Sequence, residues 1–441
     1  MVIMKPKGTG SRSLFTSRHP CGTNTISNTG AWTIHQEQHI TVGSSDSCVC
    51  PRQSVGLHSR FRSANKINPE WVALDSSRGI ETPSSKVFMR ATSLISDLLI
   101  YIPSLYFFTR TWLGSRSSYT QHTVLLALLL QPALILIDSG HFQYNSVMLG
   151  FTVLALNFFF SGHDLLGAVC FVLSIGFKQM ALYYSPAIFA YLFGKCLLLG
   201  PTRGYAANNQ WKIYMLIFYR SILFTQLGVV TLATFALLFL PWLYPPSALL
   251  DPVTRIFPFN RGLFEDKVAN FWCASNVVIK WRSFLPPSAL SKLATSATAV
   301  GFLPSIISLI NPGLKAFRSG AYLGADRAPT LSLLPYALFQ TSMSFFLFSF
   351  QVHEKSVLLP LLPLTLLAAA SSPGQSDVWE WGILVNNIAC FSMWPLLKRD
   401  GLGVQYIALV ILWNYLVGYN PLAIPSLSLK VLSLVRFLGG C

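Results

Sequence analysis

LSLLPYALFQTSMSFFLFSFQVHEKSVLLPLLPLTLLAAA, residues 331–370, contains two apolar runs, Leu331–Phe350 and Ser356–Ala370, on either side of a charged triplet. Each run reaches or approaches the ~20 residues that a helix needs to cross the hydrocarbon core of a bilayer. In lipid, only helices and closed barrels satisfy the backbone, and these runs lack the period-two alternation of barrel strands. The stretch therefore predicts two membrane-spanning helices joined by a short charged turn.

The same pattern recurs along the 441 residues, of which 52% are hydrophobic and only 11% are charged. Soluble domains carry about 25% charged residues, so the composition indicates lipid as the solvent. We predict an all-α membrane protein, a polytopic helical bundle of roughly nine or ten spans. The other apolar blocks are Thr123–Ile137, Val147–Phe160, Ile222–Tyr244 and Leu402–Leu416.

Charge and cysteine patterns exclude several classes of function. The net charge is +16, yet no basic cluster is interleaved with aromatic residues, so we expect no nucleic-acid partner. The eight cysteines show no metal-ligand spacing. Phosphate-loop, zinc-protease and serine-hydrolase motifs are also missing from the sequence, so soluble-enzyme chemistry is not indicated.

The chain divides into four segments by composition. Residues 1–66 are rich in basic and small polar residues and contain no apolar run, which predicts a divergent, disordered N-terminal segment, with a transit peptide as the alternative. Residues 67–91 are polar and predict a luminal segment before a first span at about 92–109. We assign residues 92–424 to the transmembrane bundle and 425–441 to a short tail.

The basic residues predict which connections face the cytosol. The connections 110–122, 194–220 and 311–328 carry nine lysines or arginines against one acid. By the positive-inside rule these three connections lie in the cytosol. The opposite helix ends, including residues 138–145 and the loop 244–286, then lie together on the luminal side, where we expect the functional site.

Four polar stretches interrupt the apolar blocks and supply candidate site residues. The first, residues 137–150, carries Asp138, His141 and Gln143 where one span ends and the next begins. Polar groups at this depth usually face a cavity, although a turn that caps two helices is the alternative. The second stretch carries Lys178. It is either a ligand for an anion or a lysine whose side chain extends its amino group to the membrane–water interface.

The third and fourth stretches add further charged candidates. Residues 255–273 predict an interfacial amphipathic helix with an aromatic anchor, in which Arg261 and Asp266 are candidate substrate contacts. The triplet His353, Glu354 and Lys355 places an imidazole, an acid and a base in one short turn. An imidazole can stabilise a leaving phosphate or move a proton near neutral pH.

These stretches, with residues 68–101, resemble the dolichyl-phosphate-glucose-dependent glucosyltransferases of the endoplasmic reticulum. The most specific pieces are HFQYNSVMLG (141–150), FKQM (177–180), RGLFEDKVANFWC (261–273) and FQVHEKS (350–356), and the resemblance runs from about residue 67 to about 400. GHFQYNS, KQM and FEDKVANFWC are similar to the branch that adds the first glucose. The alternative within the family is the second-glucose enzyme.

The resemblance implies a GT-C-type bundle with luminal loops in the endoplasmic reticulum membrane. It implies dolichyl phosphate glucose as donor, and as acceptor the terminal mannose of the nine-mannose oligosaccharide on dolichyl diphosphate. The implied transfer forms an α-1,3 bond with inversion, without a metal or other cofactor. His353 matches the family position that contacts the donor phosphate, whereas Lys355 and Arg261 are added on charge grounds.

Residues 1–66 depart from this family, which has an N-terminal span and an acidic luminal loop that supplies the catalytic base. Residues 1–66 contain neither, so the catalytic base is unassigned and an inactive chain is one expectation. A multipass transporter and a non-catalytic protein that binds the lipid phosphate sugar are the alternatives from other classes. The one-sided clustering of the polar stretches favours the glycosyltransferase over the transporter.

Overall fold

A computed structural model describes residues 68, 71, 82–141, 143–198, 209–240, 268–319, 328–350, 352–371 and 377–419. All regular structure within these ranges is helical. The predicted N-terminal segment and C-terminal tail, and the candidates Arg261 and Asp266, lie outside the described residues.

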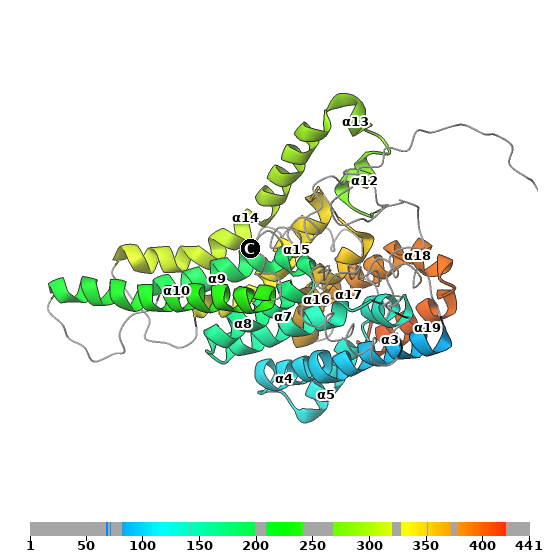
Figure 1. Cartoon of the computed structure of the whole chain (residues 1–441), viewed down its shortest axis with the longest axis horizontal. Coiled ribbons are helices and arrows are strands. Elements are labelled where there is room, and N and C mark those ends of the chain that lie inside the picture. The colour runs from blue at the N-terminus through cyan, green and yellow to red at the C-terminus, as the bar shows by residue number, and fades with distance from the viewer. Residues whose placement is uncertain are drawn as a thin grey trace, which may run out of the picture.

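Helical elements follow one another along the described part of the chain (Figure 1). The first half contains α3 (Pro83–Ser96), η2 (Asp97–Tyr101), α4 (Ile102–Trp112), α5 (Ser118–Leu129), α6 (Pro132–Leu134), η3 (Ile135–Gly140), α7 (Asn145–Phe160), α8 (Asp164–Phe177), η4 (Gln179–Tyr184) and α9 (Ser185–Leu198). The second half contains α10 (Asn209–Phe239), α12 (Phe271–Ser275), α13 (Trp281–Phe284), α14 (Pro287–Ser319), η7 (Pro329–Leu333), α15 (Leu334–Phe348), η8 (Glu354–Val357), α16 (Leu358–Ala370), α17 (Asp377–Ser392), α18 (Trp394–Arg399) and α19 (Gly403–Leu416). The segments η2 and η3 are π-helical turns, and η4, η7 and η8 are 3-10 turns.

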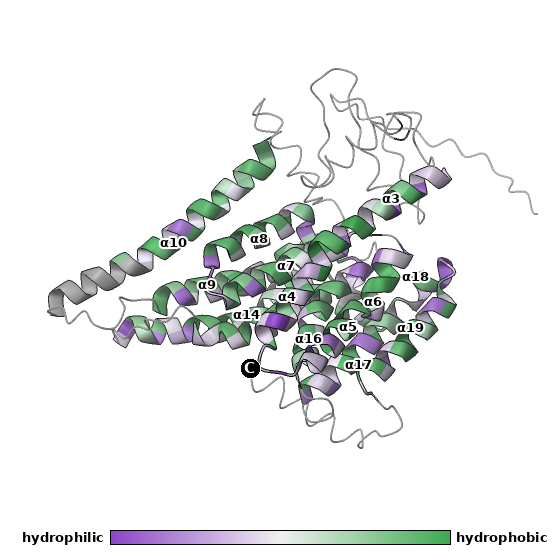
Figure 2. Cartoon of the chain, turned by 90° about the horizontal axis from the view of Figure 1, so that it is seen from below, coloured by the Kyte–Doolittle hydropathy of each residue, from purple (hydrophilic) through white to green (hydrophobic). Residues whose placement is uncertain are grey.

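Within the described ranges, six helical stretches are long and apolar enough to cross a membrane. They are Pro83–Trp112, Ser118–Gly140, Gln179–Leu198, Ser221–Phe239, Pro287–Ser319 and Pro329–Phe348, and α7, α8 and α19 are shorter apolar helices. Hydrophobic residues, coloured green, are frequent along the helices in Figure 2. The predicted all-α membrane class is therefore confirmed, while the total of nine or ten spans stays a prediction. The predicted first span, 92–109, falls inside the longer helical stretch Pro83–Trp112.

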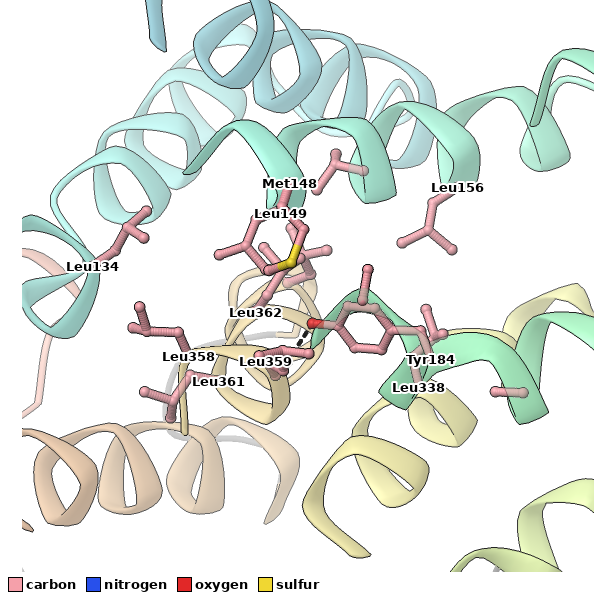
Figure 3. Close-up of a cluster of buried hydrophobic side chains, with 14 of the residues drawn as sticks. Leu134, Met148, Leu149, Leu156, Tyr184, Leu338, Leu358, Leu359, Leu361 and Leu362 are labelled. Atoms are coloured by element: carbon pink, nitrogen blue, oxygen red, sulfur yellow. Dashed lines mark hydrogen bonds between the residues drawn. The ribbon is translucent and has the colours of Figure 1, made fainter. Parts of the chain in front are cut away.

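The helix α16 lies at the centre of the bundle and packs against α15, α17, α5 and α7. Its residues from Leu358 to Leu366 are all buried, as expected for a helix that is apolar on every side. Tyr184 of η4 lies beside it, and its hydroxyl donates a hydrogen bond to the Leu359 carbonyl at 2.5 Å (Figure 3). The tyrosine thus has a polar partner inside an otherwise apolar core, as buried tyrosines usually do.

The helices α7, α8 and α9 run up and down, so their ends separate into two groups. At one end, the Lys178 amino group donates a hydrogen bond to the Gln143 side chain at 3.0 Å. At the opposite end, Lys195 and Asp164 form an ion pair at 2.7 Å. The sequence placed residues 138–145 and 178 on one side and the connection that contains Lys195 on the other, and these contacts agree with that arrangement.

The connection before α14 contains the end of the stretch 255–273, for which the sequence predicts an interfacial amphipathic helix with an aromatic anchor. Trp272 of α12 belongs to this stretch. The indole is buried, however, and its Nε1 donates a hydrogen bond to the Phe348 carbonyl at 2.8 Å. Trp281 packs edge-on against it, so Trp272 fixes this segment to the end of α15. Residues 255–267 of the predicted stretch lie outside the described residues.

The helices α9 and α14 approach each other closely because Gly194 and Gly313 face each other across their contact. The helix α14 contains Pro304 and Pro312 and bends (Figure 1), and its C-terminal part lies along α9. A β-carbon on Gly313 would lie 2.5 Å from the Gly194 carbonyl oxygen. Small residues allow such close approach between membrane helices, where van der Waals packing drives association.

We predict that Gly313→Ala lowers the free energy of unfolding by roughly 1–3 kcal/mol, because the added methyl group meets backbone that has to move. The matched control is Gly228→Ala in α10, where a β-carbon would meet nothing within 4 Å. In that variant alanine should be neutral or stabilising by about 0.5–1 kcal/mol. Unfolding of the purified variants in detergent measures the difference, and equal stability of the two would contradict the close contact.

Candidate active site

Asp138 lies in the π-helical turn η3 and faces the start of α7. Its carboxylate accepts a hydrogen bond from the Asn145 side-chain amide at 2.8 Å and another from the Ser146 backbone N–H at 2.5 Å. The first backbone N–H groups of a helix have no partner within the helix, and a carboxylate there is favoured by the helix dipole. Asp138 therefore caps α7 from the preceding span, which agrees with the capping alternative.

A second carboxylate meets the same helix end. The Ser146 hydroxyl donates a hydrogen bond to Asp97, which lies in the other π-helical turn, η2. Two spans are thus joined to the N-terminus of α7 through one serine. Asp97 was not among the sequence candidates, although a single carboxylate inside a long apolar stretch is the signal that marks such residues.

Lys178 extends this polar network towards α8. It is 8% exposed, and its amino group donates to Gln143, whose side-chain oxygen also accepts from Asn145 at 3.3 Å. A lysine that reaches the interface would expose its amino group, so the burial contradicts that alternative. Lys178 instead provides a positive charge inside the bundle, close enough to Asp138 to interact with it electrostatically.

His141 is bound from a distant part of the chain. Its Nδ1 lies against the Asp400 carboxylate, in the turn between α18 and α19. Burial lowers the pKa of His141, and the positive charge of Lys355 lowers it further, whereas Asp400 acts in the opposite direction. The neutral imidazole therefore donates Nδ1–H to Asp400, and this hydrogen bond assigns the tautomer.

The charged triplet lies where α15 ends and α16 begins. His353 precedes the 3-10 turn η8 and is half-buried, as is Glu354, while Lys355 is 4% exposed. Because Lys355 acts electrostatically on His141, the fourth polar stretch lies close to the first. The structure thus brings together candidates that the sequence separates by more than 200 residues.

These residues provide both cationic and hydrogen-bonding groups. Lys178 and Lys355 provide buried positive charge, which is suited to a phosphate group in a medium of low dielectric. Gln143, Asn145 and His141 provide amide and imidazole groups of the kind that bind sugar hydroxyls. Among the described residues, no group of three or more His, Cys, Asp or Glu side chains is arranged to hold a metal ion.

Sequence reasoning missed Asp400 as well as Asp97. Asp400 follows Lys398 and Arg399 and precedes Gly401, which has φ of 73° and closes the turn between α18 and α19. A polar turn between two apolar helices was the signal used for the other stretches. Only the tertiary contact with His141, however, separates this turn from an ordinary helix connection.

The sequence of residues 57–436 matches the ALG6, ALG8 glycosyltransferase family. The chain belongs to this family. Membership agrees with the predicted GT-C-type bundle and with an enzyme class rather than a transporter.

Three curated relatives of this ALG6, ALG8 family chain are named for the same reaction, one of them as probable. The Saccharomyces cerevisiae "Dolichyl pyrophosphate Man9GlcNAc2 alpha-1,3-glucosyltransferase" is 44% identical over 359 residues, covering 80% of this chain and 59% of that protein. A "Probable dolichyl pyrophosphate Man9GlcNAc2 alpha-1,3-glucosyltransferase" from Schizosaccharomyces pombe is 42% identical, covering 79% and 62%. The Gallus gallus relative is 40% identical, covering 78% and 60%. The chain therefore spans less than two thirds of the length of these relatives.

Proposed function

We propose that this chain transfers glucose from dolichyl phosphate glucose to the terminal mannose of the nine-mannose oligosaccharide on dolichyl diphosphate, forming an α-1,3 bond in protein N-glycosylation. The observation that carries the proposal is the 44% identity over 80% of the chain to a relative named for α-1,3 glucosyl transfer to Man9GlcNAc2. The names of the relatives favour first-glucose over second-glucose transfer.

The residues of the site have distinct roles in this reaction. A hydroxyl of the acceptor mannose attacks the anomeric carbon, the bond from that carbon to the phosphate oxygen breaks, and dolichyl phosphate leaves with the electron pair. His353, Lys178 and Lys355 stabilise the negative charge that develops on the leaving phosphate. Gln143 and Glu354 belong to the sugar-binding part of the site, and Arg261 and Asp266 remain proposed contacts on charge grounds.

The base that removes the proton from the acceptor hydroxyl is not assigned among the described residues. Asp138 is one carboxylate of the polar network, yet its two oxygens accept hydrogen bonds from Asn145 and Ser146. Both oxygens are thus engaged in contacts at the start of α7. Asp138 therefore fits a role in shaping the site better than a role in proton transfer.

Glucose transfer by the purified chain tests the proposal directly. The donor is dolichyl phosphate glucose, the acceptor is lipid-linked Man9GlcNAc2, and mass spectrometry detects one added hexose with its linkage. A chimera, in which this chain replaces the matched 359 residues of the S. cerevisiae relative, provides the same assay with that protein's flanking segments. Absence of transfer by both proteins would refute the proposal.

Two further outcomes identify the alternatives. Transfer only onto an acceptor that already bears one glucose would assign the chain to the second-glucose reaction. Movement of labelled donor across sealed vesicles without transfer would assign it to transport, and donor binding without either process would identify a non-catalytic binding protein.

We also propose that the site faces the lumen of the endoplasmic reticulum, because the basic connections lie at the opposite helix ends. Single cysteines at the exposed positions Ser139 and Ser283 should resist an impermeant thiol reagent in sealed microsomes and react after permeabilisation. The matched controls Ser115 and Ser319, exposed at the opposite ends, should react without permeabilisation. The reverse pattern would invert the topology.

A further inference from the structure

We infer that Asp400 is a positioning residue, which holds His141 in the tautomer whose Nε2 accepts a hydrogen bond from a sugar hydroxyl of the substrate. The inference deepens the proposed function and rests on it. It concerns the turn between α18 and α19, a part of the chain that the other polar stretches do not include.

The first step is the pairing itself. His141 is 6% exposed, and its Nδ1 lies against the Asp400 carboxylate, which is 22% exposed. A buried carboxylate–imidazole hydrogen bond determines which ring nitrogen carries the proton. With the proton on Nδ1, Nε2 has a lone pair and acts only as an acceptor.

The second step is the state of the other ring nitrogen. His141 Nε2 is buried and has no hydrogen-bond partner among the described residues. Buried polar atoms in native proteins almost always have a partner, so an orphaned acceptor marks a place where a ligand donor binds. A hydroxyl is the donor that both the transferred glucose and the acceptor mannose supply.

The third step is the surroundings, which keep the ring neutral. The charged groups that act on His141 are Lys355 from η8, with Arg399 and Asp400 from the end of α18. Burial and the two cations oppose protonation of the ring, whereas Asp400 favours it. A neutral ring retains its acceptor, whereas a protonated ring would donate from both nitrogens.

The fourth step is how the pair is held in place. A β-carbon on Gly140 would lie 2.9 Å from a Leu402 side-chain carbon, so the two turns also touch beside the His141–Asp400 contact. The Leu402 backbone N–H donates to the Leu397 carbonyl at 2.9 Å and closes the α18–α19 turn. The turn therefore presents Asp400 to His141 from a defined position.

Titration of His141 tests the pairing without reference to activity. In the full chain with ¹⁵N-labelled histidine, the His141 signals are identified by their loss in His141→Gln. Asp400→Asn should lower the pKa of His141, because the carboxylate raises it, and Lys355→Met should raise it. An unchanged His141 titration in Asp400→Asn would overturn the pairing.

Steady-state kinetics test the contact with substrate. His141→Ala should raise KM roughly tenfold for one substrate, the amount that one hydrogen bond contributes, with a smaller change in kcat. An increase in the donor KM assigns the hydroxyl to glucose, and an increase in the acceptor KM assigns it to mannose. His141→Gln, which places an amide oxygen near the position of Nε2, should recover most of the loss.

A double-substitution cycle separates positioning from a general structural role. Asp400→Ala should raise the same KM as His141→Ala, and the double variant should show no further loss, because Asp400 acts through His141. Asp400→Glu should restore part of the function. Independent, additive losses, or two unchanged KM values in His141→Ala, would overturn the inference. If the unsubstituted chain and the chimera transfer no glucose, the proposed function fails, while the titration still decides the pairing.

Discussion

Replacing His353 with alanine should lower the turnover of glucose transfer by roughly 100-fold or more, the range of lost electrostatic or acid–base groups. His353 precedes η8 and adjoins Lys355, whose side chain is 4% exposed. Around side chains that are shielded from water the effective dielectric constant is low. A positive or hydrogen-bonding group there acts strongly on the charge of a leaving phosphate. The interaction is greatest in the transition state, so kcat should fall more than KM rises.

The matched control for this variant is His122→Ala, because His122 is an exposed histidine of α5. It should leave turnover unchanged, and both variants should insert and unfold like the parent, since a half-buried imidazole in a turn buries little apolar area. Near-full turnover of His353→Ala with dolichyl phosphate glucose would show that the triplet only ends one helix and begins another.

The second large effect concerns stability at the opposite end of the bundle. Asp164→Ala should lower the free energy of unfolding by about 3–5 kcal/mol, because it leaves the buried amino group of Lys195 without the carboxylate that faces it. The side chain of Lys195 is 3% exposed, that of Asp164 is 7% exposed, and their charged atoms are 2.7 Å apart. Water can therefore do little to solvate the Lys195 amino group after the carboxylate is removed. Asp164 is also in the first turn of α8, where a negative charge stabilises the helix.

A double variant distinguishes the loss of a partner from the loss of an ion pair. Asp164→Leu combined with Lys195→Met replaces both charges by apolar groups and should recover most of the stability. Lys315→Met, at an exposed position of α14, is the control and should change stability by less than about 0.5 kcal/mol. Denaturant unfolding in micelles measures all three, and a small effect of Asp164→Ala would mean that water reaches the pair.

Much of the bundle could be predicted because its signal is local. Apolar runs such as Ser356–Ala370 indicate directly which segments lie in lipid. The basic connections indicate which helix ends lie on the same side of the membrane. The clustering of residues 138–145 with Lys178 followed from that alternation alone. The polar stretches therefore indicated the end of the bundle where the candidate site lies.

The pairings within the site could not be predicted, because they depend on tertiary packing. The sequence allowed Asp138 to cap a helix, but only the structure shows that its partners are Asn145 and Ser146 at the start of α7. His141 and Asp400 are 259 positions apart in the sequence. Lys178 could equally be exposed or buried on local grounds, since the long side chain suits both environments. Packing of α7 against α8 decides between them.

The two π-helical turns set the rotation of two spans about their helix axes, and so the direction in which Asp97 and Asp138 face. Each π turn accommodates one residue more than an α-helical turn, and π-bulges are frequent at functional sites. Asp97 begins η2 and Asp138 lies within η3, and both carboxylates reach Ser146. Removing one residue from either turn would restore a regular α-helix and rotate the rest of that span by about 100°. The two spans are therefore sensitive to single-residue deletions near these carboxylates, even where the deletion keeps every apolar residue in lipid.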